Sequence, residues 1–185
     1  MLKKYFERQQ HFNIVKYIYG ITIDMEVLLM KNMFCYETKI GKISIVENGS
    51  SITHMHLGEI TFPDATVLET PLIKKAFKQL QEYLNGTRKI FDLPLAPEGT
   101  EFQQKVWNAL QQIPYGKTCS YKDIAKNIGN INACRAVGMA NNKNPIAIFI
   151  PCHRVIGSNG NLIGYAGGLE MKEQLLNLEK QNMDK

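Results

Sequence analysis

One cysteine of this sequence stands in a setting that favours nucleophilic chemistry. Cys152 follows Pro151 and is followed directly by His153 and Arg154. A free thiol has a pKa of about 8.5, so it is mostly protonated at neutral pH and needs a base or a positive environment to react. His153 is a candidate base, although a hydrogen-bonded core histidine would look the same in sequence. Neighbouring residues of an extended strand point to opposite faces, so we expect a bend at Pro151 that turns both side chains towards one cavity.

The remaining cysteines favour packing over metal binding. Cys35, Cys119 and Cys134 form no Cys-x-x-Cys pair with one another or with Cys152, which argues against a zinc knuckle or a redox dithiol. In a reducing compartment such cysteines are usually small buried hydrophobic residues. We therefore expect Cys152 to differ from the other three.

The composition is that of an ordinary soluble globular protein. Hydrophobic residues make up 44% of the 185 residues and charged residues 21%, as in one sizeable domain or two small ones. No apolar run approaches the roughly 18 residues that span a bilayer. Lys3 and Lys4 are followed by the polar run Arg8-Gln9-Gln10-His11, which interrupts any signal-peptide core. We expect a cytoplasmic protein.

Positive charge is concentrated in the second half of the sequence. Seven Lys and Arg residues but a single acid, Asp123, lie between Gln103 and Tyr165. Such a stretch suits the phosphate backbone of a nucleic acid. A basic face that contacts only solvent remains the alternative.

The first part of the chain predicts a small α+β unit. Lys42–Glu47 and Ile52–Leu57 are predicted as strands joined across Asn48-Gly49, a hairpin signal. A helix is expected over Pro71–Leu84, with Thr70 as its cap and Gly86 just beyond its end. Its expected apolar stripe consists of Leu72, Ala76, Phe77, Leu80 and Leu84.

The second part predicts a mostly helical unit. Thr100 and Gln103 form a capping-box pattern at the start of a helix that Pro114-Tyr115-Gly116 ends. Two short helical patterns, Tyr121–Ile128 and Ala133–Asn141, then follow in the outline of a helix-turn-helix, which other helical hairpins share. A last amphipathic helix is expected from about Leu169 to Lys180.

Residues 1–29 carry no strong periodicity and precede a candidate domain start at Met30. Met25-Glu26-Val27 can be encoded as ATG-GAG-GTN, whose purine-rich GGAGG lies where a bacterial ribosome-binding sequence would precede the Met30 codon. We therefore expect 1–29 to be an extension that is not translated natively. The expected domains are then 30–90 and 98–185, joined by the extended, proline-containing connection 91–97.

Several stretches resemble one family of DNA repair proteins. The run Asn144-Pro145-Ile146-Ala147-Ile148-Phe149-Ile150-Pro151-Cys152-His153-Arg154-Val155 resembles the active-site signature of the O6-alkylguanine-DNA alkyltransferases, also called methylated-DNA–protein-cysteine methyltransferases. Segments that match in the same order are Thr100–Tyr121, Arg135-Ala136-Val137-Gly138 and Gly164-Tyr165-Ala166-Gly167-Gly168-Leu169. The resemblance is specific from about Phe91 to Glu179, loose from Met30 to Gly86 and absent before Met30.

The resemblance implies a reaction and a role for each matching residue of the reacting centre. Cys152 would accept the alkyl group of O6-alkylguanine, and also of O4-alkylthymine, irreversibly and once per molecule. His153 would relay the thiol proton through water while Glu179 orients the imidazole. Asn144 would shape the turn before Cys152, and Tyr121 would assist protonation of the leaving guanine.

The resemblance also implies that the damaged nucleotide is rotated out of double-stranded DNA. The helix-turn-helix would enter the minor groove, with Arg135 filling the gap in the base stack and Tyr121 crowding the target phosphate. Ser120 would lie beside the DNA, and the small residues Ala136 and Gly138 would let the second helix approach closely. The base pocket would be lined by Val155, Tyr165, Ala166, Gly167 and Gly168.

The fold implied by the resemblance is a ribonuclease H-like N-terminal domain without catalysis, followed by a mostly helical C-terminal domain with the helix-turn-helix. No cofactor, membrane or obligate protein partner is implied. Some members bind structural zinc in the N-terminal domain, but Cys35 with His54 and His56 is too small a set to predict it here. At Ala147 and Ala166 some relatives carry Pro and Ser, so the range of alkyl groups stays open.

Three alternatives remain open on sequence alone. A lesion-binding protein of the same fold would lack the nucleophile, which Cys152 argues against. A helix-turn-helix regulator with a structural cysteine would bind one DNA sequence and tolerate Cys152→Ser. A cysteine hydrolase with an acyl intermediate would need an oxyanion site that the sequence does not suggest.

Overall fold

The computed structural model describes residues 16–18, 21–23 and 31–183 of the chain. Within the first 29 residues it contains two short strands that the sequence did not predict, β1 (Lys16–Ile18) and β2 (Ile21–Ile23), which pair antiparallel. Met30, the expected start, lies outside the described residues, as does most of the expected extension. In the described part of the chain no helix is long and apolar enough to span a membrane.

Four strands form the sheet of the N-terminal domain, in the order β5-β4-β3-β6. β4 (Gly41–Glu47) and β5 (Ile52–Leu57) form the predicted hairpin across Asn48-Gly49. β3 (Lys31–Thr38) pairs antiparallel with β4 and parallel with the edge strand β6 (Ala65–Val67). The sequence did not predict β3 and β6, because one lacks strict apolar alternation and the other has only three residues.

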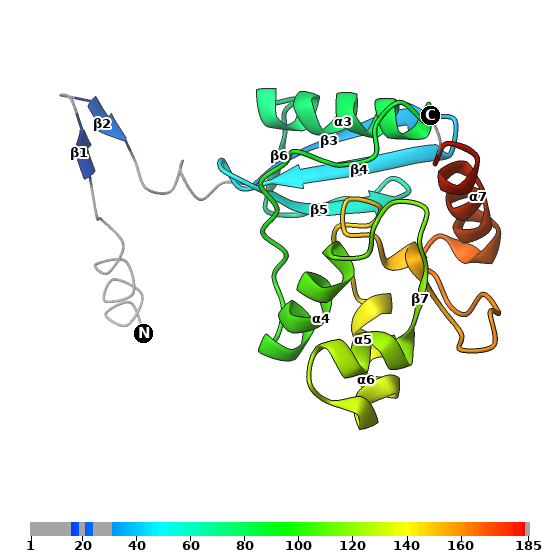
Figure 1. Cartoon of the computed structure of the whole chain (residues 1–185). Helices are drawn as coiled ribbons and strands as arrows, with labels where there is room; N and C mark the ends of the chain where they lie inside the picture. The colour runs from blue at the N-terminus through cyan, green and yellow to red at the C-terminus, as the bar shows by residue number, and fades with distance from the viewer. Residues whose placement is uncertain (1–15, 19–20, 24–30, 184–185) are drawn as a thin grey trace.

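Helix α3 (Pro71–Leu84) lies across one face of this sheet and has the predicted bounds (Figure 1). The Thr70 side chain accepts a hydrogen bond from the backbone N–H of Ile73, and Gly86 follows the helix with a φ of 74°. Both ends of the helix therefore have the caps that the sequence predicted.

The predicted apolar stripe of α3 was partly wrong. The residues at 0% exposure are Ile73, Ala76, Leu80 and Tyr83, which recur at the spacing of one helical face. Leu72 and Phe77, which the prediction included, are only partly buried at the edges of that face. The buried face of α3 is therefore rotated relative to the predicted stripe, and it includes Tyr83, an amphipathic residue, at a core position.

The C-terminal domain contains the predicted helices. α4 (Glu101–Gln111) begins with both hydrogen bonds of the capping box at Thr100. α5 (Tyr121–Asn127) and α6 (Cys134–Asn142) form the helix-turn-helix outline, joined through the short 3₁₀ turn η1 (Ile131–Ala133). The buried indole of Trp107 on α4 donates to the Ala140 carbonyl of α6 at 2.9 Å. This hydrogen bond fixes α6 against α4. α7 (Gly168–Gln181) ends the described domain.

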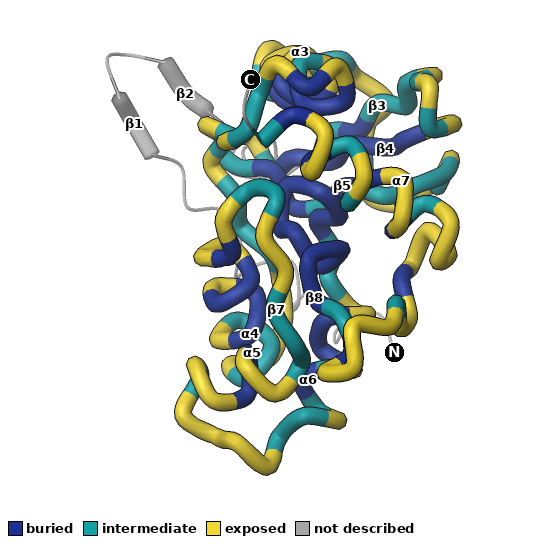
Figure 2. Tube along the Cα trace, turned by 45° about the vertical axis from the view of Figure 1, so that its right-hand side comes forward, coloured by how far each residue is buried: buried dark blue, intermediate teal, exposed yellow. Residues whose placement is uncertain are grey.

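The two domains share one hydrophobic core, seen as the continuous dark region between them in Figure 2. β5 contributes to it with its backbone as well as its side chains. The N–H of Met55 donates to the Pro145 carbonyl at 2.9 Å, and the Met55 carbonyl accepts from the N–H of Ala147 at 3.1 Å. The segment that leads to Cys152 is therefore bonded directly to the N-terminal sheet.

Candidate active site

Cys152 lies in η2 (Cys152–Arg154), a single buried turn of 3₁₀ helix directly after Pro151. The exposed fraction is 3% for Cys152, 0% for His153 and 6% for Arg154. Successive side chains of a 3₁₀ turn point about 120° apart rather than to opposite faces. This turn is the bend expected at Pro151, and extended backbone resumes after it in β8 (Val155–Ile156), which pairs with β7 (Cys119–Ser120).

Asn144 braces the turn that precedes Cys152. Its side-chain amide donates to the Ile150 carbonyl at 2.8 Å, and its side-chain oxygen accepts from the Ile146 N–H at 3.0 Å. Between these two points Ile148 has a φ of 66°, a left-handed conformation that β-branched residues rarely adopt. Asn144 thus lies where a residue that shapes the turn was expected.

Glu179 on α7 receives hydrogen bonds from four residues. Its Oε1 lies 2.8 Å from His153 Nε2 and accepts from the Tyr83 hydroxyl at 2.7 Å. Arg154 donates to the same carboxylate through Nε and Nη2 at 2.9 to 3.1 Å. The backbone N–H of Gly116 donates to Oε2 at 2.9 Å. The carboxylate therefore joins α3, η2, α7 and the loop after α4.

Burial decides the protonation of this cluster. It lowers the pKa of His153 although Glu179 acts in the opposite direction, so the imidazole is neutral at neutral pH. Burial acts to raise the pKa of Glu179, but the hydrogen bonds from His153 and Arg154 and the positive charge of Arg154 outweigh it and lower this pKa to about 2. Because His153 is neutral, Arg154 is the cation that keeps Glu179 ionised.

The neutral imidazole has one defined donor and one defined acceptor. Nε2–H donates to Glu179, which leaves Nδ1 as the acceptor. Nδ1 is buried and has no hydrogen-bond partner among the described residues. His153 can therefore take up a proton at Nδ1 while Glu179 stabilises the resulting positive charge.

Cys152 rests as a thiol. Burial raises its pKa, while hydrogen bonding by the Asn144 side chain and the charge of Lys172 oppose this rise without cancelling it. A thiol is a weaker nucleophile than a thiolate, so reaction at Cys152 needs a base that removes the proton. The neutral imidazole of His153, the next residue in the chain, offers an acceptor at Nδ1 that no described residue occupies.

Three of the five residues expected to bind DNA line one hollow of about 490 Å³. It is lined by Tyr121, Cys134, Arg135, Gly138, Met139, Asn141, Asn142, Ile163 and Gly164. The Asn141 side chain links it to the reacting centre by donating to the Cys152 carbonyl at 3.4 Å. The Tyr121 hydroxyl donates to the Ile163 carbonyl at 2.9 Å, which joins the helix-turn-helix to the loop after Cys152.

The other expected DNA contacts lie beside this hollow. The Ser120 hydroxyl is already engaged as the cap of α5, where it accepts from the Asp123 N–H at 3.1 Å. Ala136 is half-buried on α6. A Cβ at Gly138 would lie 3.8 Å from the Tyr121 ring, which is an ordinary contact, so nothing within the described protein requires glycine there.

The expected base-pocket residues differ in burial. Val155 and Tyr165 are buried, whereas Ala166, Gly167 and Gly168 are exposed at the start of α7. The Tyr165 ring meets the His153 ring edge-on, with centroids 6.5 Å apart. A Cβ at Gly167 would lie 2.5 Å from Leu57 Cδ1, so the loop approaches β5 closely and a larger residue there would displace the Leu57 side chain.

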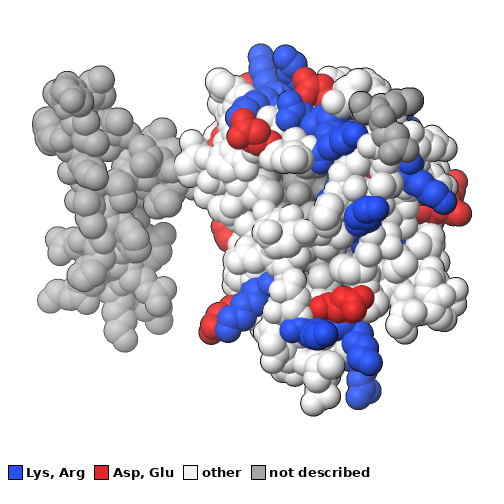
Figure 3. Space-filling model, viewed as in Figure 1, with Lys and Arg blue, Asp and Glu red and all other residues white. Residues whose placement is uncertain are grey.

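Positive charge is less concentrated around the site than the sequence suggested. Of the seven basic residues between Gln103 and Tyr165, Arg154 is buried against Glu179, which leaves six at the surface. Figure 3 shows acidic side chains among the basic ones at the end of the molecule formed by α4, α5 and α6. One of the six, Lys105, pairs with Glu101 at 2.8 Å.

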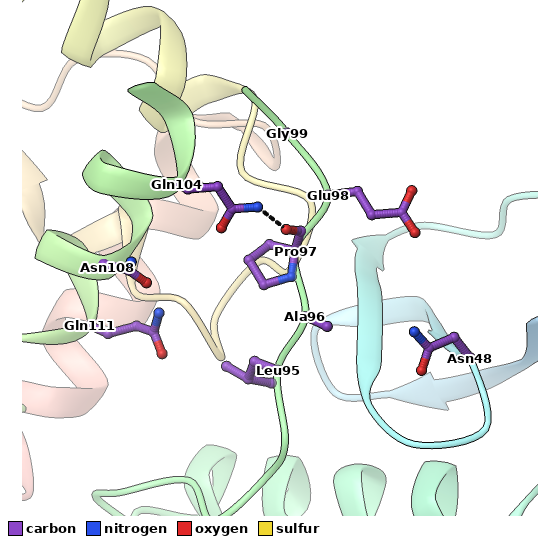
Figure 4. A pocket seen from close by; sticks show the side chains of 9 residues that line it. All are labelled: Asn48, Leu95, Ala96, Pro97, Glu98, Gly99, Gln104, Asn108 and Gln111. Carbon is purple, nitrogen blue, oxygen red and sulfur yellow. Dashed lines mark hydrogen bonds between the residues drawn. The ribbon is translucent and has the colours of Figure 1, made fainter. Parts of the chain in front are cut away.

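A larger hollow, of about 680 Å³, lies between residues 95–99 and α4 (Figure 4). The Gln104 side chain donates to the Pro97 carbonyl across its wall. Its lining includes amides and the exposed Glu98 but no cysteine or histidine, so it offers neither a thiol nor an imidazole. The chemistry of the chain therefore centres on Cys152 and not on the larger hollow.

The three residues that were too small a set to predict zinc from the sequence form no metal site among the described residues. His54 and His56 lie along β5 with ring centroids 6.0 Å apart, and Cys35 lies on β3. Across 16–18, 21–23 and 31–183 there is no group of three or more His, Cys, Asp or Glu side chains that could hold a metal ion.

Two family models match this arrangement of domains. The one described as "6-O-methylguanine DNA methyltransferase, ribonuclease-like domain" matches residues 34–97, and the one described as "6-O-methylguanine DNA methyltransferase, DNA binding domain" matches residues 101–181. The chain belongs to the 6-O-methylguanine DNA methyltransferase family. The predicted family and the predicted fold, a ribonuclease-like domain followed by a helical one, are confirmed.

Relatives within this methyltransferase family match over nearly their whole length. The methylated-DNA–protein-cysteine methyltransferase of Methanosarcina acetivorans is 54% identical over 148 residues, which cover 78% of this chain and 95% of the relative. The constitutive enzyme of that name from Bacillus subtilis is 50% identical over 152 residues, which cover 78% and 92%. The crystal structure of Mycobacterium tuberculosis OGT in complex with DNA is 44% identical, has a TM-score of 0.77 and covers 82% of this chain and 94% of that one. The chain is thus a member of a family of enzymes.

Two buried residues of the site were missed in the sequence. Tyr83 was counted as part of a helix but not as a partner of Glu179, which lies 96 residues further on. Lys172 was not singled out, although it precedes Glu179 by seven residues, two turns along the same face of α7. A lysine on the apolar stripe of a helix is the signal that could have revealed it.

We expect Glu179→Gln to destabilise the protein by about 3–5 kcal/mol, because it leaves Arg154 buried without its anion. The loss should shrink as the pH falls from 4.5 towards 2, since the wild-type carboxylate, whose pKa is about 2, contributes its stability above the ordinary value of 4.5 and loses it below. Urea unfolding across this pH range measures the difference. Glu101→Gln, in an exposed ion pair, is the control, and an equal effect there would contradict the assignment.

We expect Tyr83→Phe to lower the free energy of unfolding by about 1.5–3 kcal/mol, because the lost hydroxyl donates to a buried charge. Tyr36→Phe is the matched control, since the Tyr36 hydroxyl donates to Glu69 at 2.8 Å in a part-buried setting. Urea unfolding of both variants gives the comparison. A Tyr83→Phe loss no larger than that of Tyr36→Phe would show that the hydroxyl adds nothing to the Glu179 cluster.

Proposed function

We propose that the protein repairs DNA by moving the alkyl group of O6-alkylguanine, and also of O4-alkylthymine, onto Cys152, once per molecule. The observation that carries the proposal is the buried Cys152 thiol, followed in the same turn by a neutral histidine held by Glu179. Membership of the methyltransferase family supports the same reaction. Since its substrate is chromosomal, we expect it to act in the cytoplasm. We keep 30–90 and 98–185 as its domains, joined by 91–97, with 1–29 as an extension.

The proposed step is a displacement at saturated carbon. The Cys152 proton passes through water to His153 Nδ1, the sulfur bonds to the alkyl carbon, and the bond between that carbon and O6 breaks. The electron pair goes to the guanine, which takes up a proton with the help of Tyr121. Burial raises the pKa of Tyr121, so its phenol stays protonated and able to donate. The thioether that forms at Cys152 offers no route back, so each molecule reacts once.

The proposed DNA contact uses α5 and α6. Arg135 is exposed on α6 and lines the hollow that Asn141 links to Cys152, and we assign to it the filling of the gap left by a rotated nucleotide in the minor groove. Ala136 and Gly138 are small residues, so we propose that DNA can approach this side of α6 closely. Ser120 would lie at the edge of the same surface. The complex of the Mycobacterium tuberculosis relative with DNA supports DNA binding.

The proposed base pocket lies between η2 and the loop that leads into α7. Val155 follows the Cys152 turn directly, and Tyr165 packs against His153. Ala166 and Gly167 add exposed backbone without bulk that could bond the edge of a base, whereas the Gly168 N–H already donates to the Tyr165 carbonyl at 3.0 Å.

The proposal is tested by incubating the protein with a duplex that carries one O6-methylguanine. Intact mass should rise by one methylene unit and saturate at one per protein, and peptide mapping should assign the gain to Cys152. Cys35→Ala, on the far strand β3, should behave like the wild type, whereas Cys152→Ala should bind the DNA without any gain. Tight binding with no mass change in the wild type would instead indicate a lesion-binding protein.

Arg135→Ala should slow transfer from duplex DNA about tenfold or more, because rotation of the nucleotide costs a few kcal/mol that the side chain no longer offsets. Transfer from free O6-methylguanine should be unchanged, since no rotation is needed. Lys78→Ala, which removes one exposed positive charge on α3, controls for the general attraction to phosphate. Equal losses on both substrates would remove Arg135 from this role.

A further inference from the structure

Lys172 is a lysine without solvent and without a carboxylate. Its exposed fraction is 0%, and none of the ion pairs in the described part of the chain includes it. Its Nζ donates to two backbone carbonyls, those of Ile163 at 2.8 Å and Gly164 at 3.3 Å. An ammonium is rarely buried in this way unless an anion or a function compensates for its lost hydration.

The place of Lys172 on α7 points to the reacting centre. Lys172, Leu175 and Glu179 are the buried residues of this helix, and they lie on one face. Glu179, at the later end of the face, holds His153. Lys172 lies two turns earlier, where the face meets the loop that lines the hollow beside Cys152.

Two buried cations belong to this part of the chain, and only one of them lacks an anion: Arg154 is paired with Glu179, whereas Lys172 bonds backbone carbonyls alone. Tyr121, Tyr165 and Lys172 are the titratable side chains whose charges interact with that of Cys152. The two phenols are neutral, since burial raises the pKa of each. Burial lowers the pKa of Lys172, and a thiolate at Cys152 acts in the opposite direction, so the ammonium and the thiolate favour each other.

We propose that Lys172 is a positioning residue of the transfer site, whose buried ammonium stabilises the Cys152 thiolate and holds the Ile163–Gly164 backbone over the hollow. The inference rests on the proposed function for its purpose, but its chemistry concerns the thiol alone. His153 takes the proton, and Lys172 supplies the positive charge that remains fixed while the sulfur carries a negative one. The Ile163 carbonyl accepts from both Lys172 and Tyr121, so the same lysine also holds the point where the helix-turn-helix meets the loop.

Three substitutions separate the two parts of this role. Lys172→Gln keeps a donor for the carbonyls and removes the charge, and Lys172→Met removes both. Lys172→Arg keeps the charge. Lys180→Met is the matched control, because Lys180 lies on the exposed face of the same helix.

The readout is the rate at which iodoacetamide alkylates Cys152 in the full chain, followed by peptide mapping as a function of pH. We expect Lys172→Gln and Lys172→Met to raise the midpoint of the profile by about one to three pH units and to slow alkylation at neutral pH about tenfold or more. Lys172→Arg should retain most of the wild-type profile, and Lys180→Met all of it. A wild-type profile in folded Lys172→Gln would overturn the inference.

A second measurement needs no variant. In the wild-type protein with ¹³C-labelled lysine, the Lys172 Cε resonance should shift at the midpoint of the Cys152 profile, and the shift should disappear once iodoacetamide has blocked the thiol. Absence of the shift would equally overturn the inference. Failure of the wild type to accept a methyl group from DNA, with the Lys172 effect intact, would reject the proposed function and leave the lysine–thiolate pair standing.

Discussion

A carboxylate removed from water is costly unless its oxygens are satisfied, and Glu179 is satisfied only by groups from distant parts of the chain. Tyr83 comes from the ribonuclease-like domain, Gly116 from the loop after α4, and His153 with Arg154 from the turn at the reacting centre. Each of these segments must be in place for the carboxylate to be stable. The hydrogen bonds to Glu179 are therefore needed for three things at once. They dock α7, orient the His153 imidazole and join the two domains.

At the reacting centre, a neutral pair of residues lies among charges that are held in place. Burial keeps Cys152 protonated and His153 neutral, so the resting pair carries no net charge that would need solvent. The charges that do exist nearby, on Arg154, Glu179 and Lys172, are fixed by hydrogen bonds. In the proposed reaction, a preorganised field of this kind would act on charge as it develops on sulfur and on the leaving base, without any rearrangement.

Local signals in the sequence were sufficient for most of the helical fold. Thr70, Thr100 and Ser120 each cap a helix by accepting a hydrogen bond from the backbone N–H three residues later. A pattern of this kind is visible in a short window of sequence. The turn at Pro151 was also predicted from adjacent residues. The features that the sequence did not reveal depend on contacts between residues that are far apart along the chain. β6 exists only because β3 lies beside it, and Tyr83 becomes part of the site only when the fold brings Glu179 to it.

The position of Glu179 in the chain also sets an order of events during translation. Cys152 and His153 are made before Glu179, which follows His153 by 26 residues. At about 5–20 residues per second, a ribosome needs roughly one to five seconds to cover that interval. Until then the imidazole lacks the carboxylate that orients it, and the thiol is an ordinary cysteine of a nascent polypeptide. In the proposed reaction each molecule reacts once, and this order would keep its thiol unreacted until the chain is complete.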